Sequence, residues 1–590
     1  MVSITPFAAG NYLVDRSTSD LLALRGQINA LSNQLHTGRV AETYGELGAG
    51  RADSLAGHAM LGALNGYDAA ITSARPRLDL TTASLAQIAK ATATLRNGLL
   101  TNATDSAANT RLAREGLDSA LDALNQQIGG QYVFGGRLSG APPVLSTDII
   151  LNGDASDPAR PLAGLRTLVA EQMRADLGTG SGRLTQSSPS PTSIRLQEDA
   201  DAGARANFGF TLAGAPVVSG SFATVGYAPG AVEGAVPRFA QAPAAGDRFR
   251  VVVNLAEGGQ KTYDLAGADL ADISSAANAA ASLQALVGSG RIASVQSAAP
   301  PGLTATFANA TAPAALTINV VSQPNAGDKV AVRLALRDGT TTTLVLQAQT
   351  SADAASVTDF AIGATPAATA QNLSGALQRA LNRAAETTLA ASATARATAD
   401  FFAGSAAPGL APRRIDFSGA APAYAQTPSA STVVWYRGEI AAGDPRAAIA
   451  VRTSATATVG IGARANEDAI RAAVAGFAAL AVSDMDKVTA ATPATAERWK
   501  ALGAQALTLL PGKDALDGIA GALGLASSAL ADAQAQNKTV RTILQSHLDH
   551  LENAPTEELV VRLVDVQNRL QASYQVTSML SKLSLLNYLR

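Results

Sequence analysis

The sequence predicts a multidomain α+β protein, in which the N- and C-terminal segments form an antiparallel α-helical coiled-coil bundle and the middle is a β-rich insertion. Apolar residues repeat at heptad spacing near both ends of the chain. Short β-branched runs separated by turn residues fill the middle. A chain of 590 residues is also too long for a single core. The expected parts are residues 1–140, 141–460 and 461–590.

The first expected helix carries an apolar stripe whose members are separated by alternating steps of three and four residues: Val14, Ser17, Leu21, Leu24, Ile28, Leu31 and Leu35. Gly38 ends this helix, and the glycine-rich stretch 40–57 is expected to be a loop or a broken helix. Pro76 is expected to start or kink the next helix. The stripe of that helix consists of Leu78, Thr81, Leu85, Ile88, Thr92, Leu95 and Leu99.

A third helix is expected over 107–128. It is followed at 129–137 by the string "GGQYVFGGR", which predicts a turn or short hairpin because glycine pairs surround an aromatic-rich extended run. The string "SGAPP" at 139–143 then marks the expected domain boundary.

Two stretches of the insertion resemble each other. "AGDRFRVVVNLAEGGQKTYDLAGA" and "AGDKVAVRLALRDGTTTTLVLQA" begin about 81 residues apart, and each predicts a β-hairpin. An Ala-rich helical pattern follows each hairpin, over 272–288 and 367–399. We therefore expect two related ββα-like modules within 245–290 and 326–399.

The C-terminal part mirrors the N-terminal part. Helices are expected over 465–482 and 514–551, Pro555 breaks the second of them, and Thr556 is the expected N-cap of the last helix. The stripe of the last helix begins with Leu559, Leu563, Val566 and Leu570, and continues after a slip of register with Val576, Met579, Leu583 and Leu586.

Composition argues against several classes of function. A net charge of −2 provides no basic field for nucleic acid, and the lack of cysteine excludes disulfides, thiolate catalysis and Cys-ligated metal. We expect no membrane span, since no 18-residue apolar run occurs, and no signal peptide, since the N-terminus lacks basic and apolar regions.

Motifs for catalysis, cofactors and metals are also weak. His547 and His550 lie three residues apart, as metal ligands on a helix can, but a solvated helix end before Pro555 explains them better. No "GxSxG" string occurs, and the glycine-rich string at 129–137 lacks the Lys-Ser/Thr pair of a phosphate loop. The Asp/Gly stretch 152–160 lacks the spaced carboxylates of a Ca²⁺ loop. We expect neither an enzyme nor a bound cofactor or metal.

Four strings together resemble the bacterial flagellin and hook–filament junction family: "LSNQLHTGR" (31–39), "GQYVFGGR" (130–137), "VGIGARANEDAIR" (459–471) and "LSKLSLLNYLR" (580–590). The resemblance covers roughly 1–140 and 445–590. The acidic-pair stretch common in the family after "TGR" is missing, and "AETYGELGAGRADSLAG" stands in its place. This departure leaves the choice between flagellin and junction protein open.

The resemblance implies a secreted, extracellular subunit of the bacterial flagellum that leaves the cell by flagellar type III export. Its implied partners are further copies of itself in a helical polymer, hook-associated and cap proteins, the export apparatus and a chaperone. The terminal helices would line the inner tube, and the variable insertion would face outward. A filament flagellin for motility is the preferred hypothesis, with a hook–filament junction protein as the alternative within the family.

Two other interpretations remain open: an extracellular adhesin-like binding protein, and an ordinary intramolecular bundle. Under the preferred hypothesis the apolar stripes form the assembly interface, because each Leu removed from water contributes roughly 1.5–3 kcal/mol. We expect the ends to order on polymerisation. The expected interface residues are Leu21, Leu24, Ile28, Leu31, Leu35, Leu85, Ile88, Leu95, Leu563, Val566, Leu570, Val576, Met579, Leu583 and Leu586.

Overall fold

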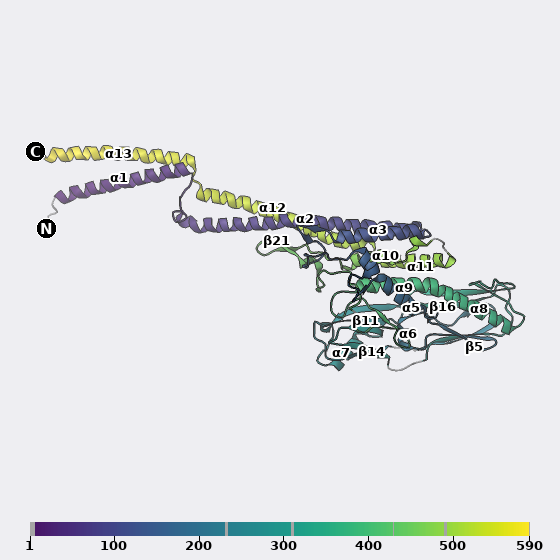
Figure 1. Ribbon diagram of the computed structural model, residues 1–590. Helices are drawn as coiled ribbons and strands as arrows, with labels where there is room; N and C mark the ends of the chain where they lie inside the picture. Colours follow the sequence, from purple (N-terminus) through teal and green to yellow (C-terminus); the bar gives the residue numbers. More distant parts are fainter. Residues whose placement is uncertain (1–5, 231–233, 308–311, 429, 489–491, 589–590) are drawn as a thin grey trace. The chain divides into compact units, whose positions relative to one another are not determined.

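The computed structural model describes residues 6–230, 234–307, 312–428, 430–488 and 492–588. Long helices near both ends and strands in between confirm the expected α+β class (Figure 1).

The chain divides into two compact units. We call Met1–Arg75, Val451–Val459 and Ala526–Arg590 the terminal unit, and Pro76–Ala450 with Gly460–Leu525 the central unit. The two units do not coincide with the three parts expected from the sequence, because several helices near the ends of the chain belong with the strands.

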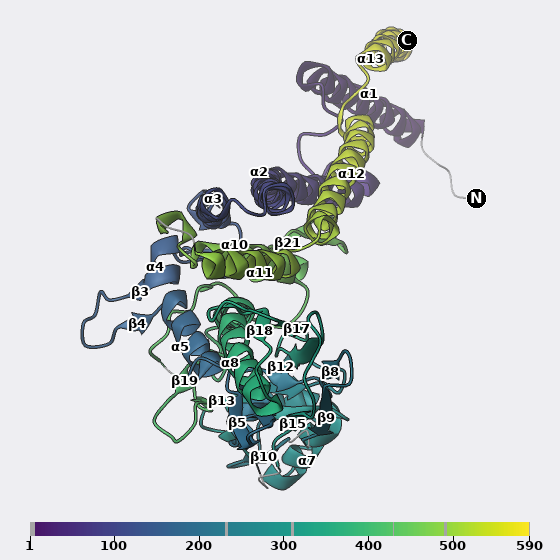
Figure 2. The same ribbon diagram turned by 90° about the vertical axis from the view of Figure 1, so that its right-hand side faces the viewer.

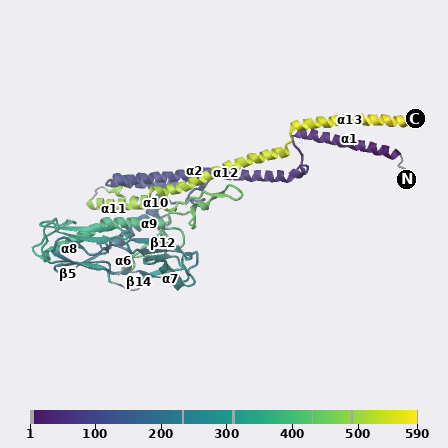
Figure 3. The ribbon, with the colours of Figure 1, turned by 180° about the vertical axis from the view of Figure 1, so that it is seen from behind.

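In the terminal unit, α1 (Pro6–Thr37) and α13 (Thr556–Tyr588) lie side by side (Figures 1 and 3). They run in opposite directions, since the residues after α1 pair antiparallel with the residues before α13 through Arg39 and Asn553. The strand pair β21 (Ala450–Arg452) and β22 (Thr458–Gly460) lies largely in this unit.

A second pair is formed by the first half of α2 (Arg51–Thr101) and the second half of α12 (Lys513–Glu552). Close approaches fix its direction: a Cβ added at Gly57 would lie 2.8 Å from Leu548, and one added at Gly50 would lie 2.9 Å from Leu551. Residue numbers rise along α2 while those of its contacts on α12 fall, so these two helices are also antiparallel.

The expected start of the second helix is wrong. The helix begins at Arg51, within the stretch expected to be a loop or broken helix, and continues through Pro76. Proline removes one helical hydrogen bond, but Pro76 is exposed and water can reach the carbonyl group that is left without a donor. The neighbouring Ala74 and Leu78 stay buried, so packing carries the helix through.

Several helices of the central unit pack against one another: α3 (Ser106–Leu124), α5 (Leu165–Leu177), α9 (Ala390–Ala403), α10 (Asp468–Ala481) and α11 (Pro493–Leu509), together with the second half of α2. Figure 2 shows α10 and α11 beside each other. Sequence patterns did not predict α11, which begins after the capping residue Thr492. Its Trp499 is buried and donates a hydrogen bond to the carbonyl oxygen of Ala103 (2.8 Å).

Two sheets and one helix enclose the larger core of the central unit. The first sheet has the order β5–β6–β15–β9, and the second the order β18–β17–β16–β7, with β8 also paired to β16. Only β17 and β18 are parallel among the strand pairs of these sheets. Their strands are β5 (Thr185–Ser190), β6 (Ser193–Gln197), β7 (Thr211–Leu212), β8 (Val217–Val218), β9 (Ala223–Ala228), β15 (Ala315–Val320), β16 (Lys329–Ala335), β17 (Thr341–Gln349) and β18 (Asp359–Ala361).

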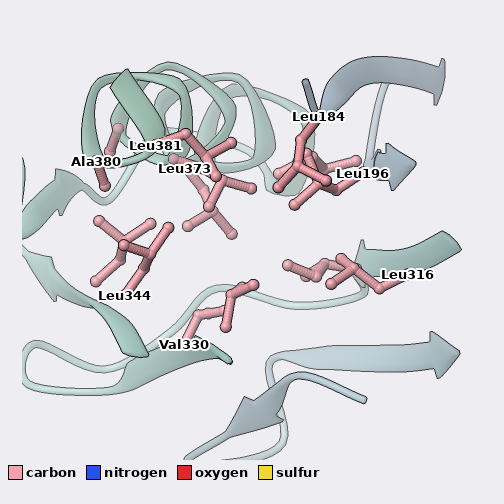
Figure 4. Packing of buried hydrophobic residues seen from close by; sticks show 14 of the residues in the cluster. Leu184, Leu196, Leu316, Val330, Leu344, Leu373, Ala380 and Leu381 are labelled. Atoms are coloured by element: carbon pink, nitrogen blue, oxygen red, sulfur yellow. The ribbon is translucent and has the colours of Figure 1, made fainter. Parts of the chain in front are cut away.

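Alternating side chains of these strands supply the core. Figure 4 shows Leu196 and Leu316 of the first sheet, Val330 and Leu344 of the second, and Leu373 of α8 (Pro366–Ala384) in one cluster. A π-helical turn, η3 (Ala385–Leu389), joins α8 to α9. The alternation is the pattern that a strand shows when one of its faces is buried.

A smaller core lies among α7 and two further sheets, β12–β11–β13 and β10–β14. These elements are α7 (Ala276–Val287), β10 (Ala235–Phe239), β11 (Arg248–Asn254), β12 (Gln260–Ala266), β13 (Arg291–Ser297) and β14 (Leu303–Phe307). The remaining elements are short: β1 (Gln127–Ile128), β2 (Gln131–Tyr132), α4 (Thr147–Asn152), β3 (Gly153–Asp154), β4 (Leu162–Ala163), α6 (Ala202–Asn207), β19 (Ile415–Asp416) and β20 (Ala423–Tyr424), with 3₁₀ turns at Gly48–Gly50, Gly267–Asp269, Pro445–Ala448 and Met485–Lys487.

Both expected hairpins are present, as β11 paired with β12 and β16 paired with β17. A helix follows each hairpin, α7 after the first and α8 after the second. Whether the two stretches are related modules stays a prediction.

Candidate assembly surface on the terminal helices

The stripe of α1 lies on the face that packs beside α13. The five expected interface residues of this helix, Leu21, Leu24, Ile28, Leu31 and Leu35, are all half-buried, and most residues between them are exposed. The heptad spacing therefore predicted the correct face of the helix. A two-helix pair leaves that face only partly shielded from water.

On α13 the half-buried face follows Leu563, Val566 and Leu570, as expected. It then continues with Ser573 and Thr577, without the expected slip of register.

Val576 and Met579 are 56% and 64% exposed, so they do not belong to this half-buried face, and their expected place in the assembly interface stays a prediction. The side chains of Leu583 and Leu586 lie outside the described residues.

Unlike the other expected interface residues, Leu85, Ile88 and Leu95 are buried in the central unit. They lie in the central-unit half of α2 and are 0–1% exposed. Because the chain's own core encloses them, they are not available to a neighbouring copy in this fold, and we remove them from the candidate surface.

Sequence reasoning missed a set of exposed apolar side chains on α13. Val561 is 69% exposed and Val564 is 50% exposed, next to the packed stripe. The full set that defines the α13 outer surface is Val560, Val561, Val564, Tyr574, Val576 and Met579. The signal was present in the sequence as valines beside the heptad positions, which widen the apolar face beyond a narrow two-helix seam.

The break after α1 and the break between α12 and α13 lie side by side, joined by backbone hydrogen bonds. The amide of Val40 donates to the carbonyl oxygen of Glu552 (2.8 Å), and the amide of Ala554 donates to that of Gly38 (3.0 Å). Gly38 has φ +70°, a conformation that favours glycine. We call Gly38–Val40 with Glu552–Ala554 the junction.

A polar cluster centred on the carboxylate of Glu552 lies at the junction. The hydroxyl of Ser54 donates to Glu552 Oε1 (2.5 Å), and His58 Nε2 lies 2.8 Å from the same oxygen. The hydrogen bond from Ser54, followed by the interaction with His58, holds the pKa of Glu552 below its ordinary value. The charged carboxylate is therefore the form that the folded chain favours.

A second polar cluster lies between α2 and α12 farther along. Asn537 is 6% exposed, and its amide donates to Asp68 Oδ1 (3.3 Å) and to the carbonyl oxygen of Thr453 (3.2 Å). Arg541 forms an ion pair with Asp68. A polar group that is buried and paired between two helices favours one register over its neighbours.

In the central unit, the structure brings together two of the strings that carried the family resemblance. Gly135 pairs antiparallel with Arg464, and the amide of Ala465 donates to the carbonyl oxygen of Phe134 (3.0 Å). Phe134 is fully buried. Strings separated by more than 300 residues therefore form one local structure.

The structure and the comparisons give few other indications of function. No described helix has both the length and the hydropathy needed to cross a membrane. Across the described ranges, His, Asp and Glu side chains form no group of three that could hold a metal ion, and His547 and His550 are exposed. No protein-family model matches the sequence, and no curated protein matches it.

Proposed function

We propose that this chain is a structural subunit of the bacterial flagellum that polymerises through its paired terminal helices. A filament flagellin is the preferred role, and a hook–filament junction protein is the alternative. Secretion by the flagellar apparatus and binding to hook-associated, cap and chaperone proteins form part of the same proposal.

The observation that carries the proposal is a contrast in burial between two apolar stripes of similar spacing. Leu85, Ile88 and Leu95 are completely enclosed by the chain, whereas Leu21, Leu24, Ile28, Leu31 and Leu35 are only half-buried. Leaving apolar surface in water is unfavourable by roughly 25 cal/mol per Å². Contacts with further helices of the same kind would remove the remaining surface from water.

The α13 outer surface supports the same conclusion. Its valines and Met579 are largely exposed, whereas Leu563, Val566 and Leu570 are half-buried, so the helix has apolar side chains on more than one face. A helix with apolar side chains on several faces is typical of one that is surrounded by neighbours. We further propose that α1 with α13, and α2 with α12, are antiparallel coiled coils, and that the two hairpin–helix stretches are related outward-facing modules.

The test is Val561→Asp in the full-length chain, examined by negative-stain electron microscopy and analytical ultracentrifugation. Val561 is exposed, so the substitution leaves the fold of the single chain intact, and we expect it to abolish assembly. Val217→Asp is the matched control, because Val217 is also 69% exposed but lies in the central unit, outside the terminal helices. This control should assemble.

Long filaments formed by the wild type would favour the flagellin role, and short oligomers the junction role. If Val561→Asp assembles as well as the wild type, the α13 outer surface is not an assembly surface. A wild-type chain that stays monomeric at all concentrations, with both ends protected from protease, would overturn the structural role itself.

A further inference from the structure

The turns of the two hairpins meet in the central unit and border a cavity of about 300 Å³. A Cβ added at Gly259, in the β11–β12 turn, would lie 3.1 Å from Gly339, in the β16–β17 turn. The remaining walls are the segment from β6 into α6, the short strand β7, and Tyr227 of β9. The volume is at the lower end of the range for small-molecule sites.

Arg337 contributes a cation to this wall, and the carboxylates of Glu198 and Asp176 attract it. Its Nη2 donates to the backbone carbonyl oxygens of Arg205 and Phe208, and Arg337 makes no ion pair with a carboxylate of the described chain. Burial, followed by repulsion from Arg396, lowers the pKa of Arg337 to about 10. An anion in the cavity would stabilise the charged guanidinium.

The other polar groups of the wall limit which anion fits. Glu198 is 7% exposed, and its Oε1 accepts from the amide of Leu212 (2.7 Å). The wall therefore already contains one carboxylate, which would repel an anionic ligand. Because repulsion from Glu198 grows with the charge of the ligand, a monoanion is favoured over a phosphate, which carries −1.5 to −2 at neutral pH.

Two hydroxyl groups of the wall have spare hydrogen-bonding capacity. Tyr227 donates to the carbonyl oxygen of Leu212 (3.2 Å), and Thr211 donates to that of Ala335 (3.4 Å). Each hydroxyl oxygen can still accept a hydrogen bond, so both suit a ligand that carries hydroxyl donors.

We propose that this cavity binds a small hydroxylated monocarboxylate, of the size and chemistry of a uronic acid, with its carboxylate on Arg337. A planar carboxylate matches the guanidinium group geometrically. Ligand hydroxyls would donate to Tyr227 and Thr211. The site lies within the central unit, so it does not depend on the proposed assembly.

The test is isothermal titration of the full-length chain with D-glucuronate, D-glucose and D-glucose 6-phosphate. We expect saturable binding of glucuronate and at least about tenfold weaker binding of the other two, since each lacks the favoured charge. Arg337→Gln should weaken glucuronate binding by about ten- to hundredfold, the range for a hydrogen-bonded charge. Arg333→Gln, an exposed position on β16, the strand that precedes Arg337, should leave binding unchanged.

A second pair of variants keeps the proposal testable if Arg337→Gln fails to fold. Ala256 is exposed and borders the cavity. Ala256→Glu should weaken glucuronate binding by charge repulsion, and the neutral Ala256→Gln should weaken it less. The proposal is overturned if glucuronate does not bind, if the phosphate binds more tightly, or if neither Arg337→Gln nor Ala256→Glu changes the affinity.

Discussion

At Gly116, α3 approaches α10 so closely that no larger residue fits. A Cβ added there would lie 2.6 Å from the ring of Phe477, which is fully buried and cannot swing into solvent. Replacing a glycine inside a helix by alanine normally stabilises the helix by about 1 kcal/mol. Overpacking of a rigid ring costs typically 1–3 kcal/mol, so the steric term should prevail.

We therefore expect Gly116→Ala to destabilise the protein by up to about 2 kcal/mol, as the balance of these two terms. Gly518→Ala is the control, because Gly518 is an exposed helical glycine with no neighbouring atom within 4 Å of the added group. It should gain up to about 1 kcal/mol. Thermal unfolding followed by circular dichroism measures both effects, and an unchanged or raised Tm for Gly116→Ala would contradict the packing argument.

Glu552 gives the junction a dependence on pH. Its pKa is lowered in the folded chain, so its contribution to stability is fully present above the ordinary Glu value of about 4.3 and is lost as the pH falls through the folded value. Hydrogen exchange of the Val40 amide should therefore become less protected in acid, after correction for the intrinsic exchange rate. Glu552→Gln should reduce protection at neutral pH and remove this pH dependence; equal protection in both proteins would contradict it.

At the scale of single elements, heptad spacing identified the packed face of α1 and the beginning of the face of α13. It failed after Leu570, because the slip followed the apolar residues Val576 and Met579. The helix instead keeps its geometric phase and places Ser573 and Thr577 on the packed face. Small polar side chains fit where two helices lie close, and sequence periodicity alone does not separate this case from a change of register.

The boundaries of α2 and the existence of α11 were missed for other reasons. Proline is a strong local signal, but the long-range packing on either side of Pro76 outweighs one lost hydrogen bond. In α11, Trp499 is anchored by the carbonyl oxygen of Ala103, a partner almost 400 residues away. The cavity beside Arg337 could not be predicted because it arises only when distant segments meet, whereas the valines of the α13 outer surface are visible beside the heptad positions.

The Asp68 cluster should set the register between α2 and α12. We expect Asp68→Ala to destabilise the terminal unit by about 1–3 kcal/mol, because Asn537 and Arg541 each lose a partner in a shielded position. Asp532→Ala, an exposed change on α12, should stay within about 0.5 kcal/mol of the wild type. Urea unfolding measures both, and equal midpoints would show that the cluster contributes nothing to stability.

For the whole molecule, the two compact units predict a different proteolytic core from the one that the sequence suggested. The terminal helices are only half-buried, so they should open and be cleaved first. Limited trypsin digestion of the unassembled chain should cut early after Arg39 and Arg562, and leave a resistant core close to Pro76–Leu525. Mass spectrometry of the fragments decides between this core and one near 140–460, which would instead favour the three-part division.

The junction also has a consequence for how the terminal unit can bend. A continuous helix resists bending through a regular ladder of hydrogen bonds along its axis. At Gly38–Val40 and Glu552–Ala554 both ladders stop together, and two backbone hydrogen bonds between these segments, with the Glu552 cluster, take their place. We therefore expect bending of the terminal unit to be concentrated at the junction, with α1 and α13 moving together as a pair.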